Sequence, residues 1–247
     1  MKAFVIALVD QSYEPLTRSI EKTESPLDLH WLPATTSLTI KDDRKAFPKF
    51  RWSWPMLSSQ DGLDMKTGVY KFVYQAKEQG KKVACSLSHM KAWQKCVDLD
   101  EPIVIFEADA VVKRKIDHYW CERTCRRGVR LGNLAPDPDQ ALVIGLNDPR
   151  GATRRAGTYH AKQVEYGEGI NPVSTVNESG ENPVPQGLAG NSAYYITPTG
   201  AKNLLQGAEE YGMWPNDAFM CKELFPFLRQ AYPYYTTISG TESTTTR

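Results

Sequence analysis

The sequence predicts an α/β domain with a central, mostly parallel, Rossmann-like sheet flanked by helices. Three observations support this prediction. An apolar, β-branched run over residues 1–9 stops at Asp10, as the first strand of such a sheet does. A polar helical stretch over residues 14–24 and an alternating stretch over residues 27–32 follow, and together they complete a strand, helix, strand unit. The apolar run 103–106 is typical of a strand buried on both faces.

A helix is predicted immediately before that buried strand. Residues 84–98 place Leu87, Met90, Trp93 and Val97 on one helical face. Ser86 or Ser88 can cap the start of this helix, where exposed amide groups would favour a phosphate. A further helical stretch is expected earlier, over residues 70–79.

The carboxyl-terminal third continues the alternation of strands and helices. A short apolar strand over residues 141–146 ends in Asn147 and Asp148, and a second strand covers residues 192–196. Thr197 is expected to cap the next helix, with Pro198 in its first turn and residues 200–207 continuing it, and another helix starts near residues 213–217. We therefore expect one domain over residues 1–240 and a flexible polar tail over 241–247.

Two segments show no sustained periodicity. Residues 151–187 are rich in glycine, proline and polar residues, so a long loop acting as a flap beside the substrate is expected. Residues 47–55 interleave prolines and aromatics, and Trp52 and Trp54 either stack on a base or sugar ring or cover the core.

The composition is that of an ordinary globular protein. The 30 Lys and Arg residues nearly balance the 29 Asp and Glu residues, which gives no indication of binding to nucleic acid or an acidic membrane. No apolar run approaches the roughly 20 residues of a spanning helix. Because the five cysteines are an odd number without regular spacing, we expect free thiols and a cytoplasmic location.

Two acids end the buried strand. Side chains alternate in an extended chain, so Glu107 and Asp109 point the same way while Ala108 points to the other side. Acids at the carboxyl end of a strand can hold a divalent cation that in turn holds a diphosphate. The alternative is an ordinary strand end with solvated or capping acids.

A second candidate metal site has a weaker signature. His118, Cys121 and Cys125 fall on one helical face, and His160 could be a fourth ligand. A zinc site is not expected here, because the paired C-x-x-C or H-x-x-x-H spacing is missing.

Three motifs together resemble a known family. In order they are A-C-S-L-S-H-M-K-A-W, then I-V-I-F-E-A-D-A, then S-A-Y-Y-I-T-P-T-G-A-K-N-L-L, followed by P-N-D. This order resembles glycosyltransferase family 25, the lipooligosaccharide and collagen galactosyltransferase group, over about two thirds of the chain. The resemblance implies a GT-A-like fold and transfer of a sugar, galactose or glucose, from a UDP-linked donor to a hydroxyl group with inversion.

The resemblance also implies roles for individual residues. Glu107 and Asp109 match the first and last acids of the acidic motif and would bind Mn²⁺, with Mg²⁺ as the alternative, while Ala108 replaces the middle acid. The donor site would further comprise Ser86, Ser88, His89 and Asn191. Asp217, in the P-N-D motif, would be the general base that accepts the proton of the attacking hydroxyl.

Other functional classes compete with this interpretation. Ala108 motivates a catalytically impaired homologue that only binds a glycan or another protein. A nucleotidyltransferase would share the acids at the strand end, but residues 10–13 lack the glycine-rich loop that such an enzyme carries after its first strand. The sequence does not determine the acceptor, and the candidates are a glycan or even a modified base in nucleic acid.

Overall fold

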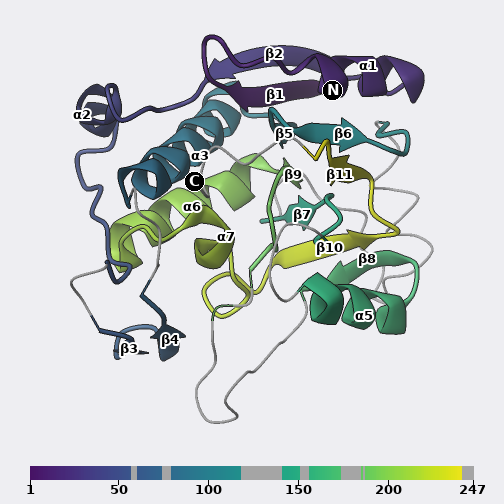
Figure 1. Ribbon diagram of the computed structural model, residues 1–247. Helices are drawn as coiled ribbons and strands as arrows, with labels where there is room; N and C mark the ends of the chain where they lie inside the picture. The colour runs from purple at the N-terminus through teal and green to yellow at the C-terminus, as the bar shows by residue number, and fades with distance from the viewer. Residues whose placement is uncertain are drawn as a thin grey trace.

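The computed structural model describes residues 1–56, 60–73, 79–117, 141–150, 156–173, 185 and 187–240. Within them, seven strands form one sheet in the order β2-β1-β5-β9-β7-β10-β8 (Figure 1). The strands of this sheet are β1 (Lys2–Ala7), β2 (Asp28–Pro33), β5 (Ile103–Glu107), β7 (Val143–Gly145), β8 (Gly169–Pro172), β9 (Ala193–Ile196) and β10 (Leu228–Tyr232).

Two small sheets and several helices complete the described fold. Strand β3 (Gly62–Asp64) pairs with β4 (Val69–Lys71), and β6 (Ala110–Val112) pairs with β11 (Thr236–Ile238). The helices are α1 (Glu14–Lys22), α2 (Ile40–Asp43), α3 (Gln79–Leu99), α5 (Ala156–Tyr166), α6 (Pro198–Tyr211) and α7 (Asn216–Phe219), with a 3₁₀ turn η1 (Arg44–Ala46).

The predicted α/β fold with a mostly parallel sheet is confirmed. Strands β2, β1, β5, β7 and β10 run in one direction, whereas β9 and β8 run in the other. As predicted, β5 is an inner strand, and it lies between β1 and β9. Since β9 is antiparallel to both of its neighbours, its first residue lies at the same edge as the carboxyl ends of β5 and β7.

Alternate residues of the strands supply two separate cores on the two faces of the sheet. Phe4 and Ile105 belong to the core that also contains residues of α3, α6 and α7. Val5 and Phe106 belong to the core on the other face, which includes Leu16 of α1. Figure 1 shows α3 and α6 side by side on the sheet. Because side chains alternate along a strand, β1 and β5 each lie between two apolar layers.

Two segments differ from the sequence-based prediction. Residues 69–71 form strand β4, so the helix expected over 70–79 is wrong there. The expectation of an irregular loop over 151–187 is wrong for α5 and β8, which cover much of residues 156–172. Strand β8 pairs with β10 at the sheet edge, a long-range contact that local periodicity does not reveal.

The helix ends show one success and one failure of sequence reasoning. Thr197 caps α6 as predicted, because its hydroxyl accepts a hydrogen bond from the amide of Gly200. Helix α3 begins at Gln79, so the prediction that Ser86 or Ser88 caps its start is wrong. The apolar face used for that prediction covers only the part of α3 that packs on the sheet.

The tryptophans of the 47–55 segment contribute to the core. Trp54 is buried, and its ring centroid lies 5.5 Å from that of Trp214. Trp52 packs partly buried against the same core. The structure thus supports the core-covering alternative over ring stacking on a ligand.

Several sequence-based predictions lie outside the described residues. They include the zinc-ligand candidates His118, Cys121 and Cys125 and the polar tail 241–247. None of the helices in the described ranges is both long and apolar enough to cross a membrane.

Candidate active site

The candidate site lies where β5, β7 and β10 end and β9 begins. The amide of Glu107, the last residue of β5, donates to the carbonyl of Ser192 just before β9. The amide of Leu146, just after β7, donates to the carbonyl of Ala193. These bonds hold the ends of neighbouring strands together, so that side chains far apart in sequence meet at one edge of the sheet. Ligands bind at this edge in open α/β sheets.

Glu107 is held by a chain of buried side chains. Nε2 of His89 lies 3.2 Å from its Oε1, and Nδ1 of His89 lies 2.8 Å from the hydroxyl of Tyr194. That hydroxyl accepts from Nε1 of Trp93 at 2.9 Å. If the hydroxyl of Tyr194 donates to Nδ1 of His89, every donor in this hydrogen-bond network has an acceptor. Nε2 of His89 then donates to Glu107. We assign this neutral tautomer of His89 from the network.

Asp109 follows in the turn between β5 and β6. Its backbone carbonyl accepts from the amide of Ser239 at 2.8 Å. Its Oδ1 is buried and has no hydrogen-bond partner among the described residues. Burial, and secondarily the negative charge of Glu107, raise the pKa of Asp109 to about 6. Glu107 and Asp109 are partly exposed and Ala108 is buried, but Ala108 and Asp109 lie in a turn and not in the extended segment that the sequence predicted.

Unpartnered buried polar atoms gather at the same edge. Buried polar groups in proteins are normally hydrogen-bonded, and exceptions need an explanation. Besides Asp109, the part of the chain that the structure describes leaves four such atoms next to the strand ends, Oδ1 of Asn147 and Asn191, Oγ of Ser192 and Oγ1 of Thr236, and a fifth, Oδ1 of Asn216, at the start of α7. A polar ligand is the kind of partner that would satisfy them.

A thiol stands beside the His89 and Glu107 pair. The potential ligand atoms of Cys85, His89 and Glu107 all lie within 4.8 Å of one another. Burial, followed by the charge of Glu107 and more weakly that of Asp217, raises the pKa of the Cys85 thiol well above its usual range. The mixed set of sulfur, nitrogen and oxygen suits Zn²⁺, whereas the carboxylates of Glu107 and Asp109 suit Mn²⁺ or Mg²⁺.

Asp217 lies exposed in the first turn of α7, and its Oδ1 accepts from the amide of Ala218. Helix α7 packs against α3, the helix that carries Cys85 and His89. Gly187 packs so closely on α7 that an added Cβ would stand 1.7 Å from the carbonyl oxygen of Asp217. This contact fixes the segment that carries the candidate base.

The structure brings some of the proposed donor-site residues together and places others in the core. Ser86 and Ser88 are buried inside α3, and their hydroxyls donate to the carbonyls of Trp214 and Ala84. Ser88 also accepts from the amide of Thr35. A contact between either hydroxyl and a donor would require it to leave these protein partners.

Asn191 lies beside the acidic pair. It is buried, has a φ of 33°, and donates from Nδ2 to the sulfur of Met220 at 3.2 Å. Its Oδ1 is one of the unpartnered atoms, so this side chain keeps an acceptor unused at the strand edge.

Sequence reasoning missed the residues that support Glu107. Tyr194 was assigned only to a strand, and its hydroxyl is the centre of the buried network. Thr236 was missed as well, because strands β10 and β11 were not predicted. The polar pair Asn147 and Asp148 at a strand end was the available signal for the neighbouring part of the site.

An acidic, polar edge at the ends of a mostly parallel sheet is the arrangement of enzymes that bind nucleotide-linked substrates. Residues 60–220 match the sequence model of glycosyltransferase family 25, described as an LPS biosynthesis protein. The chain belongs to this family, and its sheet and flanking helices form the GT-A-like fold expected for it. It is therefore a glycosyltransferase by family.

Solved structures of other glycosyltransferases are similar to this chain at low identity. The galactosyltransferase LgtC, in complex with donor and acceptor sugar analogues, shares 12% identity over 94% of this chain and 73% of its own, with a TM-score of 0.40. The bifunctional glycosyltransferase WbbM shares 14% over 92% of this chain and 38% of its own, with a TM-score of 0.41. Mouse xyloside xylosyltransferase 1 shares 11% over 92% and 84%, with a TM-score of 0.36. No curated protein matches the chain significantly.

Proposed function

We propose that the chain transfers a sugar, galactose or glucose, from a UDP-linked donor to a hydroxyl group of an acceptor glycan, with inversion and with help from a divalent metal. The observation that supports this most strongly is the pair of acids at the end of β5, in which Asp109 keeps a buried carboxylate oxygen without a partner in the described chain. The family membership supports glycosyl transfer, and this pair supports the metal-assisted form of it.

The residues present fit a divalent cation. Burial, and after it the negative charge of Glu107, raise the pKa of Asp109, and a bound cation would favour the charged form of this carboxylate. Glu107 and Asp109 would hold Mn²⁺, with Mg²⁺ as the alternative, through oxygen ligands that both ions accept. When bound, such an ion neutralises the charge of a departing diphosphate.

The replacement of the middle acid by Ala108 is compatible with this proposal. Ala108 is only 5% exposed and belongs to the core that contains Val5 and Leu16. An acid at this position would point into that apolar layer unless the turn changed. The two outer acids can therefore act as metal ligands without it.

His89 would orient Glu107 rather than touch the donor. Its position between Tyr194 and Glu107 restricts the carboxylate to one arrangement, since Nδ1 is occupied by the tyrosine hydroxyl. Asn191 is another donor-site candidate, because its Oδ1 has no hydrogen-bond partner in the described chain. This oxygen would accept a hydrogen bond from a hydroxyl or amide group of the nucleotide sugar.

Asp217 would be the general base. In a single displacement the acceptor oxygen bonds to the anomeric carbon, the bond from that carbon to the diphosphate oxygen breaks, and the acceptor proton moves to a carboxylate. Asp217 is exposed on α7, which packs against the helix α3 that carries His89, so it would meet an acceptor beside the donor site.

The test combines donor binding with a matched pair of variants. Melting temperature and sugar transfer are measured with UDP-, GDP- and CMP-linked sugars, each with and without Mn²⁺. A donor that binds only the folded protein raises the melting temperature. We expect a Mn²⁺-dependent shift with a UDP-sugar, which is lost in Asp109→Asn together with transfer activity, on the order of a thousandfold. The control is Asp100→Asn, at the exposed opposite end of β5.

Two outcomes would contradict the proposal. A Mn²⁺-dependent donor shift that persists in Asp109→Asn would remove Asp109 from the metal site. If no nucleotide sugar binds or reacts across the panel, the alternative of a catalytically impaired glycan- or partner-binding protein is favoured.

A further inference from the structure

An open depression lies at the carboxyl ends of β7 and β10, on the same edge of the sheet as the acidic pair. Its volume is about 400 Å³, enough for sugar units. The residues on which the argument depends are Lys113, Arg150, His160, Tyr232, Tyr234 and Thr236. Three of them, Tyr232, Tyr234 and Thr236, lie beyond the segment that matches the family model.

Strand β11 connects this depression with Asp109. Thr236 begins β11, and Ser239 directly after it donates its amide to the carbonyl of Asp109. Three residues of extended chain span about 10 Å. Strand β11 pairs along its length with β6, so this separation is fixed by a hydrogen-bonded sheet. A ligand that touches Thr236 would thus lie about two sugar rings from Asp109.

Aromatic rings form one wall of the depression. The centroids of Tyr232 and Tyr234 lie 5.4 Å apart with planes at 85°, and the ring of His160 packs within 6.1 Å of both. Nδ1 of His160 lies 3.3 Å from the hydroxyl of Tyr234. Rings with an apolar body and a polar edge suit a ligand that is apolar on its ring face and polar around it, as a saccharide is.

The two cationic side chains of the depression differ in whether they form an ion pair. Arg150 binds both oxygens of Asp148 through Nε and Nη2. Lys113 is exposed and forms no ion pair with any residue in the described ranges. The depression thus holds a neutralised pair and one available ammonium group, which favours a ligand with one anionic group.

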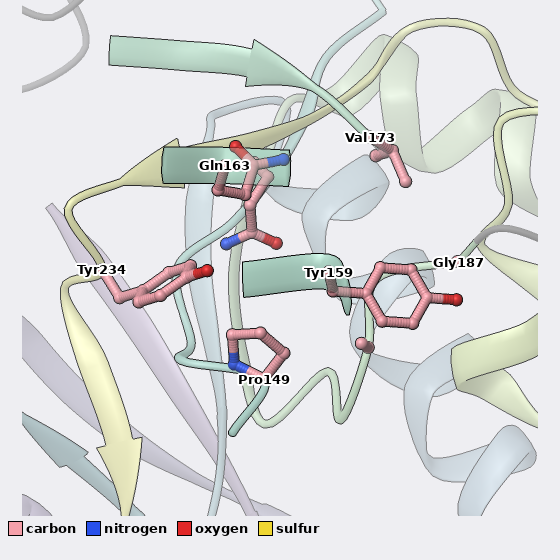
Figure 2. Close-up of a pocket in the computed structure, with 8 residues that line it drawn as sticks. Pro149, Tyr159, Gln163, Val173, Gly187 and Tyr234 are labelled. Atoms are coloured by element: carbon pink, nitrogen blue, oxygen red, sulfur yellow. The ribbon is translucent and has the colours of Figure 1, made fainter. Parts of the chain in front are cut away.

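Thr236 supplies an independent sign of a ligand. Its side chain is only 1% exposed, and its hydroxyl has no hydrogen-bond partner in the part of the chain that the structure describes. The neighbouring Tyr234 also borders a second cavity, shown in Figure 2 with Tyr234 on one side and Tyr159 on the other. That cavity measures about 10 Å³ and holds no more than one water, so a saccharide fits only the larger depression.

We propose that the depression binds an anionic saccharide, bearing a carboxylate or a phosphate, as part of the acceptor. The aromatic wall contacts the sugar ring, Lys113 binds the anionic group, and Thr236 hydrogen-bonds a hydroxyl of the sugar. This inference rests on the proposed glycosyl transfer, because only that reaction makes the ligand an acceptor. It narrows the acceptor from any glycan to a charged glycan.

The experiment measures saccharide binding to the full chain without donor or Mn²⁺, by saturation-transfer NMR and titration. The probes are glucose 6-phosphate, glucuronic acid and glucose at millimolar concentration. We expect an anionic probe to bind and glucose to bind at least about tenfold more weakly. The stronger of the two anionic probes identifies the source of the charge as phosphate or carboxylate.

Two variants and one control test the assigned contacts. Lys113→Gln should raise the Kd of the anionic probe about tenfold, to that of glucose, whereas Lys115→Gln, also exposed but outside the depression, should leave it unchanged. Thr236→Val keeps the shape and removes an unpartnered hydroxyl. It should therefore weaken binding without lowering the melting temperature, a combination that a structural hydroxyl would not give.

Any of three results would overturn the inference. The first is equal binding of glucose and the anionic probes, and the second is unchanged binding of the anionic probe to Lys113→Gln and Thr236→Val. The third is displacement of the saccharide by UDP, which would assign the depression to the donor. Failure of the proposed function has a different signature, namely no donor-dependent transfer with any acceptor. If transfer occurs and the acceptor KM is unaffected by Lys113→Gln, only the acceptor inference fails.

Discussion

At the scale of single residues, the candidate site depends on one chain of hydrogen bonds. Trp93, Tyr194 and His89 are buried and meet only in the folded protein, and they position the carboxylate of Glu107. Because both ends of the Tyr194 hydroxyl are used, its loss leaves a buried donor on Trp93 and a buried acceptor on His89. This residue therefore links stability with the orientation of the acid.

We predict that Tyr194→Phe lowers the free energy of unfolding by about 2 kcal/mol, because two buried polar groups lose their partner. Donor binding should weaken as well, since His89 is no longer fixed. Urea unfolding and UDP-sugar titration on the same samples check both effects. Tyr166→Phe, which removes an exposed hydroxyl from α5, is the control and should change stability by less than about 0.5 kcal/mol. Equal stability of the two variants would refute the network.

Asp109 should make stability depend on pH in an unusual direction. Its pKa is raised from 3.8 to about 6 in the folded state, so between these values the folded protein holds a proton that the unfolded chain has released. Stability contributed by this residue is present below pH 4 and is lost as the pH rises to about 6. Because Asp109 is partly exposed, we expect a loss of about 1 to 2 kcal/mol rather than the full value.

The measurement is the difference in unfolding free energy between wild type and Asp109→Asn at pH 4.5 and at pH 7. We expect the unfolding free energy of Asp109→Asn to increase relative to that of wild type as the pH rises, because the amide of the variant carries no charge. Asp100→Asn serves as the control and should show no such gain. A constant difference between wild type and Asp109→Asn at both pH values would show that Asp109 is not desolvated in the folded state.

At the scale of elements, the close approach of residue 187 to α7 positions the candidate base. Helix α7 has only four residues, and such a short helix relies on its tertiary contacts. The bridge between Gly187 and Cys221 and the contact with the Asp217 carbonyl provide them. No side chain fits between these backbones.

We predict that Gly187→Ala displaces α7 and lowers the rate of sugar transfer about a hundredfold, since small displacements of a catalytic group have such effects. Mn²⁺-dependent donor binding should persist, because Glu107 and Asp109 lie on other elements. The matched control is Gly157→Ala in α5, where an added Cβ meets no atom within 4 Å. It should retain full activity and a stability at least equal to wild type. Normal turnover in Gly187→Ala would exclude Asp217 as a base positioned by this contact.

At the scale of the whole molecule, the two cores are inseparable. Each inner strand contributes alternate side chains to both, as Ile105 and Phe106 do within β5. Removing either layer would expose one face of the same seven-stranded sheet. The sheet thus joins the elements that carry the acids with those that line the depression.

We predict a single cooperative transition in calorimetry for the full chain, because neither core can persist without the shared strands. UDP-sugar with Mn²⁺ should shift the whole transition to higher temperature. Two resolved transitions, with only one responding to the donor, would show that the two ends of the sheet unfold independently.

The sequence by itself determined the elements whose signals are local. The apolar runs of β1 and β5, the strand β2 and the cap of α6 are determined by neighbouring residues, and these elements were predicted correctly. The order of the motifs identified the family. Local periodicity and motif order suffice for such features because neighbouring residues alone produce them.

Only the tertiary structure decided which residues meet. Strands β8, β10 and β11 are stabilised by partners distant in sequence, so no local pattern predicted them, and the same holds for the depression that they border. The reversal of β9 brings Tyr194 to His89, while the buried length of α3 turns Ser86 from a cap into a core residue. Hydrogen bonds and desolvation depend on distance in space, and distance in space is what the folded sheet sets.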